Sequence, residues 1–375
     1  MKNSLTSLLV ACLLIFTSCQ NSNETKVAFT SKNLTYAKGF TVQRSGDYKK
    51  ITIQNPYKNA SKKYTYLLVP KHLEIPKHDP ETQIIRTPVE RMVVTSTSHI
   101  PLLELLNVEK TLVGFPNTDF ISSERTRKLI KDKTLIDLGK SESINTEILL
   151  DLAPELVMSF AVDKPNKTFT NIKKMGIPIV LNGDWLEETP LGRAEWIQLF
   201  GAIYEKEKEA DSIFKKIETD YNKAKATATS ANTRPTIVSG SIFQDVWYLP
   251  AGESFIATYF KDAKTDYLWK DSKGTGSLSL SFETVLEKGQ HANFWIGCSL
   301  YETKQALAAG SIHYKKFDAF AQNTYTFANR KGETGGLVYF ELGPIRPDLI
   351  LKDIIKITHP ELLPEHKLFF FEKLK

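Results

Sequence analysis

The alternation of hydrophobic and polar positions predicts that this chain begins, after its first 26 residues, with β structure. The stretch GFTVQRSGDYKKITIQNPY contains two alternating runs on either side of Ser45-Gly46-Asp47. Such runs around a glycine-containing turn are typical of a β-hairpin. YTYLLVPK and IIRTPVERMVVTSTS continue the extended pattern. We therefore predict a β-rich N-terminal extension over residues 27–90.

From Arg91 the pattern changes to short apolar runs that alternate with helical periods. The predicted strands are RMVVTST, TLVGF, TLIDLG, LVMSFA and IPIVLNG. The predicted helices between them are IPLLELL, SSERTRKLIKDK, NTEILLDL and FTNIKKMG. This alternation indicates a parallel sheet that is covered by helices on both faces. We predict an N-terminal α/β lobe over residues 91–192.

Residues 193–230 are helical without strands. Their second part, EKEKEADSIFKKIETDYNKAKATA, places Ala210, Ile213, Phe214, Ile217 and Tyr221 on one helical stripe, opposite a charged face. Alternation resumes at PTIVSGSI and DVWYLP and continues to the end, so residues 231–375 form a second lobe. The predicted fold class is α/β, with two Rossmann-like lobes joined by a single long helix and an N-terminal β-hairpin extension. Small ligands commonly bind between two such lobes.

The first residues have the features of an export signal. MKNSLTSLLVACLLIFTSC contains a lysine at position 2, an apolar run over 8–16, and small residues before Cys19. The apolar run is shorter than the roughly 20 residues needed to cross a bilayer. We predict a lipoprotein signal peptide over 1–18, lipid attachment at Cys19 and a polar tether over 19–26. An ordinary secretory signal with a chance cysteine is the alternative, since Phe16 replaces the usual leucine.

Composition narrows the classes of function. The chain has a net charge of +6 with scattered basic residues, so nucleic-acid binding is not indicated. Of its three cysteines, only Cys298 lies beyond the signal and the anchor, so no disulfide framework is predicted. No G-x-S-x-G elbow, P-loop or H-E-x-x-H motif is present, and the seven histidines are dispersed. We therefore predict no catalytic residues, no cofactor and no direct metal site.

Two similar stretches each contain one acid at the start of a predicted helix. SINTEILLDLAPELV carries Glu147 after Asn145, and LSFETVLEKGQHANFWI carries Glu283 after Ser281. A first-turn glutamate is favoured by the helix dipole, by about 0.3–1 kcal/mol. That effect alone can account for each acid, and it does not exclude a further role.

RMVVTSTSHIPLLELLNVEKTLVG, SINTEILLDLAPELVMS, GDWLEETPLGRAEWIQLFG and SFETVLEKG occur in an order that resembles a known family. Over residues 85–375 the chain is similar to periplasmic binding proteins that deliver cobalamin, iron-siderophores or haem to ATP-binding cassette (ABC) importers. The resemblance implies a monomer, anchored by lipid to a bacterial membrane in the periplasm or at the cell surface. Its implied partners are a permease with its ATPase, and Glu147 and Glu283 would dock on permease arginines. The implied ligand is a metal chelate, with an iron-siderophore ahead of cobalamin or haem.

The family's plan places ligand contacts on loops that follow strands and face the other lobe. The expected ligand-binding residues are Ser96, Thr97, Ser98, His99, Asn117, Phe120, Lys140, Ser141, Phe160, Trp185, Trp247, Tyr248, Ser299, Tyr339, Phe340 and Arg346. Aromatic rings suit a flat macrocycle or an aryl-rich chelate, and Arg346 and Lys140 could pair with ligand carboxylates or catecholates. Core packing is the alternative for each tryptophan. Trp247 and Tyr248 are adjacent on a strand, so at least one of them should leave the core. A lipid-anchored enzyme on this scaffold, or a structural surface lipoprotein, are the other classes of function.

Overall fold

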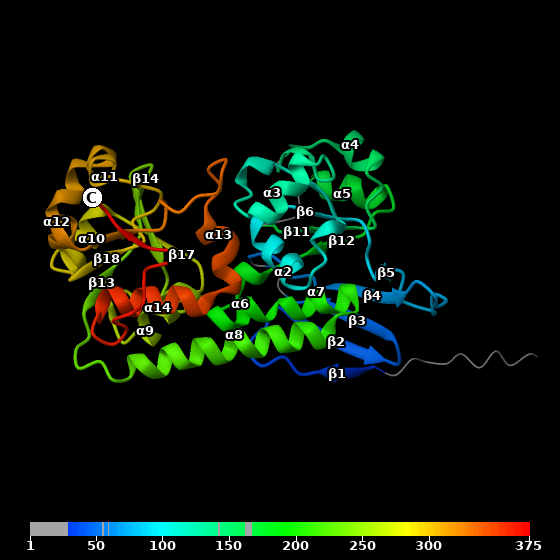
Figure 1. The fold of residues 1–375 in the computed structure, drawn as a ribbon, viewed down its shortest axis with the longest axis horizontal. Helices are drawn as coiled ribbons and strands as arrows, with labels where there is room; N and C mark the ends of the chain where they lie inside the picture. Colours follow the sequence, from blue (N-terminus) through cyan, green and yellow to red (C-terminus); the bar gives the residue numbers. More distant parts are fainter. Residues whose placement is uncertain (1–28, 55, 59, 142, 162–166) are drawn as a thin grey trace, which may run out of the picture.

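The computed structural model describes residues 29–54, 56–58, 60–141, 143–161 and 167–375 (Figure 1). The predicted signal peptide, the lipid-attachment residue Cys19 and the tether all lie outside these ranges. Within them, no helix has both the length and the apolar character needed to cross a bilayer.

The N-terminal extension is a five-stranded sheet with the order β1-β2-β3-β4-β5. Its strands are β1 (Thr30–Lys32), β2 (Phe40–Ser45), β3 (Tyr48–Ile53), β4 (Tyr64–Pro70) and β5 (Gln83–Thr87). The predicted hairpin is the β2–β3 pair. The extension is larger than a hairpin because β4 adds antiparallel to β3 and β5 adds parallel to β4.

The N-terminal lobe contains an all-parallel sheet with the order β12-β11-β6-β7-β8. The strands are β6 (Met92–Val94), β7 (Leu112–Phe115), β8 (Ile136–Asp137), β11 (Leu156–Ser159) and β12 (Ile179–Leu181). The helices are η1 (Thr97–His99), α2 (Ile100–Leu105), η2 (Glu109–Thr111), η3 (Thr118–Phe120), α3 (Glu124–Lys131), α4 (Thr146–Asp151) and α5 (Lys167–Lys174), and β9 (Gly139–Lys140) pairs with β10 (Ser143–Ile144). β6, β7, β11 and β12 are buried throughout, as expected for strands covered on both faces.

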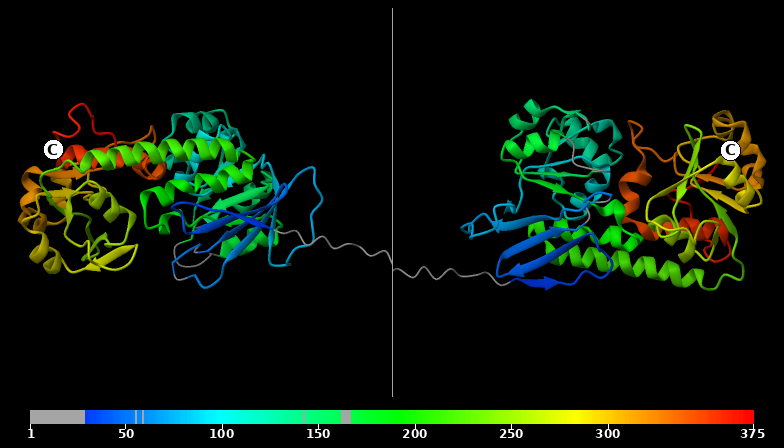
Figure 2. Two further views of the ribbon diagram at one scale, coloured as in Figure 1. Left: turned by 90° about the horizontal axis from the view of Figure 1, so that it is seen from below. Right: turned by 180° about the vertical axis from the view of Figure 1, so that it is seen from behind.

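Three helices connect the lobes: α6 (Pro190–Glu195), α7 (Ile197–Tyr204) and the long α8 (Glu207–Ala228), preceded by the short η4 (Asp184–Leu186). α8 runs along the base of both lobes (Figures 1 and 2). Its 22 residues span about 33 Å. The predicted stripe is largely confirmed, because Ala210, Phe214, Ile217 and Tyr221 are buried. Tyr221 also donates a 2.8 Å hydrogen bond to Asp262 of the second lobe.

The C-terminal lobe has a five-stranded sheet with the order β16-β13-β18-β19-β20 and a separate antiparallel sheet with the order β14-β15-β17. The strands are β13 (Thr236–Val238), β14 (Ser241–Phe243), β15 (Val246–Pro250), β16 (Asp266–Tyr267), β17 (Ser277–Leu280), β18 (Phe294–Ile296), β19 (Thr324–Thr326) and β20 (Glu372–Lys373). The helices are α9 (Phe255–Asp262), α10 (Phe282–Gly289), α11 (Lys304–Gly310), η5 (Ile312–Lys316), α12 (Asp318–Gln322), α13 (Val338–Leu342), η6 (Gly343–Ile345) and α14 (Pro347–Thr358). The two α/β lobes with the long α8 between them confirm the predicted fold class, and the shorter helices α6 and α7 precede α8 in the connection.

Two buried carboxylates hold the extension against the connecting helices. Glu195 accepts backbone hydrogen bonds from residues 35–37 at 2.7–2.8 Å. Glu187 accepts from the backbone of residues 38 and 39 and from Nε1 of Trp196. Burial raises the pKa of Glu187 although these donors lower it. The extension is therefore fixed to the same helices that set the position of the two lobes.

Candidate functional site

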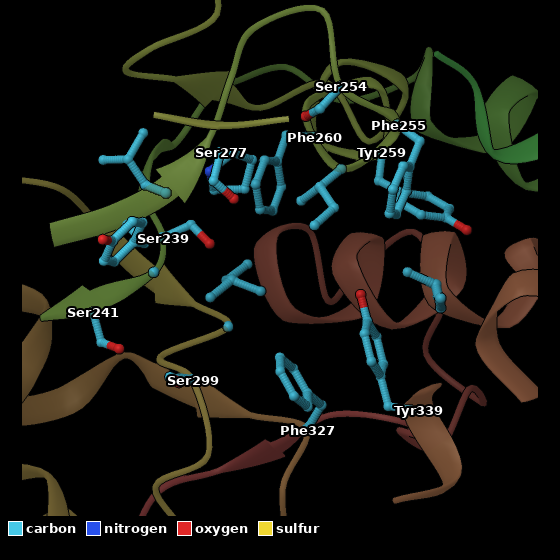
Figure 3. A pocket seen from close by; sticks show the side chains of 18 of the residues that line it. Ser239, Ser241, Ser254, Phe255, Tyr259, Phe260, Ser277, Ser299, Phe327 and Tyr339 are labelled. Atoms are coloured by element: carbon cyan, nitrogen blue, oxygen red, sulfur yellow. The ribbon is translucent and has the colours of Figure 1, made fainter. Parts of the chain in front are cut away.

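A cavity of about 460 Å³, here called the inner chamber, lies at the C-terminal ends of β13 and β18 (Figure 3). Its lining combines hydroxyl groups with aromatic and aliphatic side chains. In Figure 3 the rings of Phe255, Tyr259 and Phe260 lie on one side of the chamber, and those of Phe327 and Tyr339 lie on the other. The hydroxyl groups belong to Ser239, Ser241, Ser254, Ser277 and Ser299, among others. Such a chamber can bury a large apolar or aromatic ligand and orient it through hydroxyl hydrogen bonds.

A second cavity of about 430 Å³, here called the interlobe groove, lies between the two lobes. Its N-terminal wall is Thr95, Ser96, Thr97, Phe115, Pro116, Phe120, Ser141 and Phe160, and its C-terminal wall is Leu300, Gly335, Leu337 and Phe340. The groove adjoins the inner chamber, because Phe340 follows Tyr339 and Leu300 follows Ser299. The ring of Phe340, which lines the groove, lies 5.4 Å from that of Phe327 and 5.7 Å from that of Tyr339, which both line the inner chamber.

The backbone at one wall of the inner chamber is held from behind by two tryptophans. Nε1 of Trp247 donates to the carbonyl of Ser239 at 3.0 Å, and Nε1 of Trp295 donates to the carbonyl of Gly240 at 2.9 Å. Gly240 has φ +80, and a Cβ there would lie 1.9 Å from the carbonyl oxygen of Tyr248. Only glycine therefore fits the turn that brings Ser239 and Ser241 to the chamber.

Most of the expected ligand-binding residues line one of these two spaces. Trp185, Tyr248, Ser299 and Tyr339 line the inner chamber. Ser96, Thr97, Phe120, Ser141, Phe160 and Phe340 line the interlobe groove. Asn117 stands beside the groove in a left-handed conformation, with Nδ2 3.5 Å from the hydroxyl of Ser141.

Three of the expected residues are buried instead. Trp247 is 0% exposed and stacks on Trp295 at 5.4 Å, so the core-packing alternative holds for it. The short turn η1 directs His99 and Ser98 inward, and Ser98 bonds to the hydroxyl of Ser96 at 2.8 Å. Burial lowers the pKa of His99 to about 4, so its ring is neutral at physiological pH. These side chains support the site but do not line it.

The two expected cations also lie elsewhere. Arg346 forms a two-pronged ion pair with Asp348, at 2.9 and 3.0 Å, and lines none of the cavities described above. Burial tends to raise the pKa of Asp348, but Arg346 and Lys352 hold it below its ordinary value. Lys140 is exposed on β9, outside both spaces.

The sequence reasoning missed Arg193, which lines a small hollow of about 120 Å³ together with Phe255, Tyr339 and Phe340. Its guanidinium lies 4.4 Å from the centre of the Phe255 ring and 3.1 Å from Asp184. Its Nε is buried and has no hydrogen-bond partner among the described residues. Because Arg193 belongs to the connecting helices, its position after Gly192 gave no signal of a binding role.

Residues 330–342, here called the bridging segment, extend from the C-terminal lobe to the N-terminal lobe (Figure 1). The carboxylate of Glu341 accepts hydrogen bonds from the backbone of Ser122 at 2.6 Å and of Ser123 at 2.9 Å. A Cβ at Gly336 would lie 2.1 Å from the carbonyl oxygen of Phe120, so the two backbones are in direct contact. Burial raises the pKa of Glu341 to about 7, despite the backbone donors. The bridging segment thus fixes one side of the groove.

The repeated acids Glu147 and Glu283 are exposed in the first turns of α4 and α10. The side chains of Asn145 and Ser281 cap the two helices, as the sequence pattern indicates. Within the described part of the chain, neither glutamate takes part in an ion pair. Both carboxylates are therefore available to a partner.

The described residues include no group of three or more His, Cys, Asp or Glu side chains placed to hold a metal ion. Cys298 is a free, buried cysteine, and burial raises the pKa of its thiol to about 12.

Comparison with known proteins places the architecture in one family. The sequence profile described as periplasmic binding protein matches residues 92–329. An uncharacterized lipoprotein of Methanocaldococcus jannaschii is 27% identical over 94% of this chain and 89% of its own length. A possible iron-binding, periplasmic solute-binding protein from Staphylococcus epidermidis has a TM-score of 0.57 at 16% identity, over 73% of this chain and 100% of its own. A periplasmic heme-binding protein from Pseudomonas aeruginosa has a TM-score of 0.56 at 15% identity, over 76% and 99%.

The profile spans well over half of the chain, across both lobes and the connecting helices. The family consists of substrate-binding proteins rather than enzymes. As the resemblance predicted, this chain belongs to the periplasmic binding protein family.

Proposed function

We propose that this protein is the lipid-anchored, extracytoplasmic binding component of an ABC importer and that it captures a metal chelate between its lobes. The observation that carries the proposal is the aromatic inner chamber, which opens beside a groove walled by both lobes. The names of the iron-binding and heme-binding proteins with similar folds support this class of ligand. The relative that is named a lipoprotein supports anchoring at Cys19 to a membrane, in the periplasm or at the cell surface.

A ferric siderophore is the first candidate ligand, and cobalamin or haem come next. The anionic preference that was expected from Arg346 has no support in the lining, because every residue that lines the inner chamber or the interlobe groove is uncharged. Arg193 lines only the small hollow beside the aromatic walls, where its guanidinium is paired with Asp184 at 3.1 Å. The permease receives the chelate and its ATPase drives transport, and no cofactor is needed for this role.

Fluorescence titration of the purified protein tests the proposal. Trp185 lines the inner chamber and is partly exposed, so a bound coloured chelate should quench emission. The panel is a ferric tris-catecholate, a ferric tris-hydroxamate, haemin and cyanocobalamin. One of them should bind with micromolar or tighter affinity, and Phe340→Ala should weaken that binding by about tenfold or more, since a half-exposed ring is removed from the wall.

The matched control is Ile312→Ala, because Ile312 is a large apolar residue exposed on η5 away from both spaces. Saturable binding that Phe340→Ala weakens and Ile312→Ala leaves unchanged would support the proposal. If none of the four chelates binds, or if both variants have the same effect, the chelate-binding role is wrong.

A further inference from the structure

A further cavity of about 480 Å³, here called the side chamber, lies where the N-terminal extension meets the C-terminal lobe. The extension contributes Tyr57, Lys58 and Ala60 to its lining. The segment around η4 contributes Trp185, Leu186 and Glu188, and the other wall is Ala251 with residues 273–278. The extension is therefore positioned to take part in ligand binding as well as to support the connecting helices.

The side chamber and the inner chamber share part of their walls. Trp185, Thr275, Gly276 and Ser277 line both spaces. A molecule whose body fills the inner chamber can therefore extend a substituent past Trp185 into the side chamber. Nε1 of Trp185 is buried and has no partner among the described residues, so an unused donor lies at this boundary.

The two chambers differ in charge. Every residue that lines the inner chamber is uncharged. The side chamber is lined by Lys58, Lys273 and Glu188. Glu188 is paired with Lys38 at 2.6 Å, and Lys273 with Glu253 at 3.1 Å. Lys58 has no ion-pair partner within the described ranges, so one positive charge remains unmatched.

Backbone hydrogen bonds order both walls of the side chamber. On the extension side, the backbone of Ala60 donates to the carbonyl of Tyr57 at 3.2 Å, which closes a turn around Lys58. On the other side, Glu253 accepts from the backbone of Gly274 at 2.8 Å, and the backbone of Ala251 donates to Gly276 at 2.9 Å. A preformed space lowers the ordering cost of binding.

We infer that the ligand has two parts, an uncharged apolar or aromatic body in the inner chamber and a negatively charged substituent in the side chamber, held by Lys58. This inference rests on the proposed function of the cleft and specifies the chemistry of its ligand. The extension then acts as a third wall of the binding site and selects for the anionic substituent.

Two dyes with the same aromatic framework test the inference without a natural ligand. Anilinonaphthalene sulfonate carries a negative charge, and N-phenylnaphthylamine lacks the sulfonate. Both fluoresce in apolar cavities, and each should displace the other if they share the inner chamber. Lys58→Glu should weaken binding of the sulfonate by about threefold to tenfold, as expected for a charge reversal near solvent, and leave the neutral dye unchanged. The neutral variant Lys58→Gln should have a smaller effect in the same direction.

Lys63→Glu is the matched control, because Lys63 is exposed on the same extension and lines none of the cavities described above. About 0.5 M salt should remove the difference between wild type and Lys58→Glu, since exposed charges are then screened. The inference is overturned if Lys58→Glu leaves sulfonate binding unchanged, or if Lys63→Glu weakens it equally. Failure of all four chelates to bind would instead count against the proposed function, so the two failures are distinguishable.

Discussion

At the scale of single residues, Trp247 and Tyr248 are chain neighbours with opposite surroundings. Trp247 is fully buried against Trp295, whereas Tyr248 is 41% exposed and lines the inner chamber. Trp247→Ala should lower the free energy of unfolding by about 3–5 kcal/mol, because it leaves a large cavity in the core. Tyr248→Ala should cost about 1 kcal/mol or less but weaken chelate binding. Urea denaturation and fluorescence titration of both variants measure these effects, and equal destabilisation by the two changes would contradict this assignment.

The sequence could predict that one of this pair leaves the core, but not which one. Strand alternation places the two side chains on opposite faces of the sheet, but it does not determine which face is buried. The face of Trp247 is buried because Tyr314 and Phe317 pack against it, with ring centroids 5.6 and 5.2 Å away. These two residues lie about 70 positions further along the chain. The ion pair of Arg346 was also not predicted from the sequence. Its partner Asp348 is only two residues away, but the geometry of their ion pair depends on how α14 begins.

At the scale of elements, the helices and strands of the lobes were largely predictable from hydrophobic periodicity. The five-stranded extension was not, because β5 pairs in parallel with β4 after a connection that has no pattern of its own. The bridging segment was also missed. Its contacts with the N-terminal lobe join residues about 200 positions apart, and the glycines that permit them look like ordinary loop glycines in the sequence. Local patterns therefore predict elements better than they predict the contacts that build the groove.

The bridging segment gives an expected pH dependence. Glu341 is 2% exposed, and its pKa is raised from 4.5 to about 7 chiefly by burial. The folded state therefore holds this proton more tightly than the unfolded state does. The contribution of the Glu341 proton to the free energy of unfolding is fully present below about pH 4.5. It declines as the pH rises towards 7 and is lost above that pH. The total change should be at most about 3 kcal/mol.

Glu341→Gln isolates this contribution, because glutamine cannot titrate at the same position. Glu104 is the other carboxylate at this contact, through Ser123 and Thr126, and it is retained in both proteins. As the pH rises from about 4.5 to 7, the free energy of unfolding of wild type should fall relative to that of Glu341→Gln. Urea denaturation at a series of pH values provides the measurement. A difference that stays constant over this range would show that Glu341 does not titrate there.

At the scale of the whole molecule, the described residues join the lobes both at the base and beside the groove. α8 packs along the base, against α7 in one half and α14 in the other, and the bridging segment joins the lobes beside the groove. We therefore expect the lobes to make only small relative motions. A permease that binds such a molecule could therefore contact both lobes at once, with one contact on each lobe at a nearly constant distance from the other.

Glu147 and Glu283 provide one exposed acid on each lobe, and we expect both to dock on permease arginines. Neither lines the inner chamber or the groove, so their charges should affect docking and its salt dependence more than ligand binding.

Each single change of Glu147 or Glu283 to alanine should reduce transport severalfold and leave the chelate affinity unchanged. Glu147→Arg with Glu283→Arg should reduce transport much further, because like charges then face the permease at both contacts. High salt should reduce wild-type transport in the same way, because it screens the exposed charges. The Debye length is about 8–10 Å at moderate salt and shortens as salt is added. Uptake into vesicles with the cognate permease, paired with titration of the same variants, measures both effects. Uptake at the wild-type rate by the doubly reversed protein would show that the two glutamates serve only to start their helices.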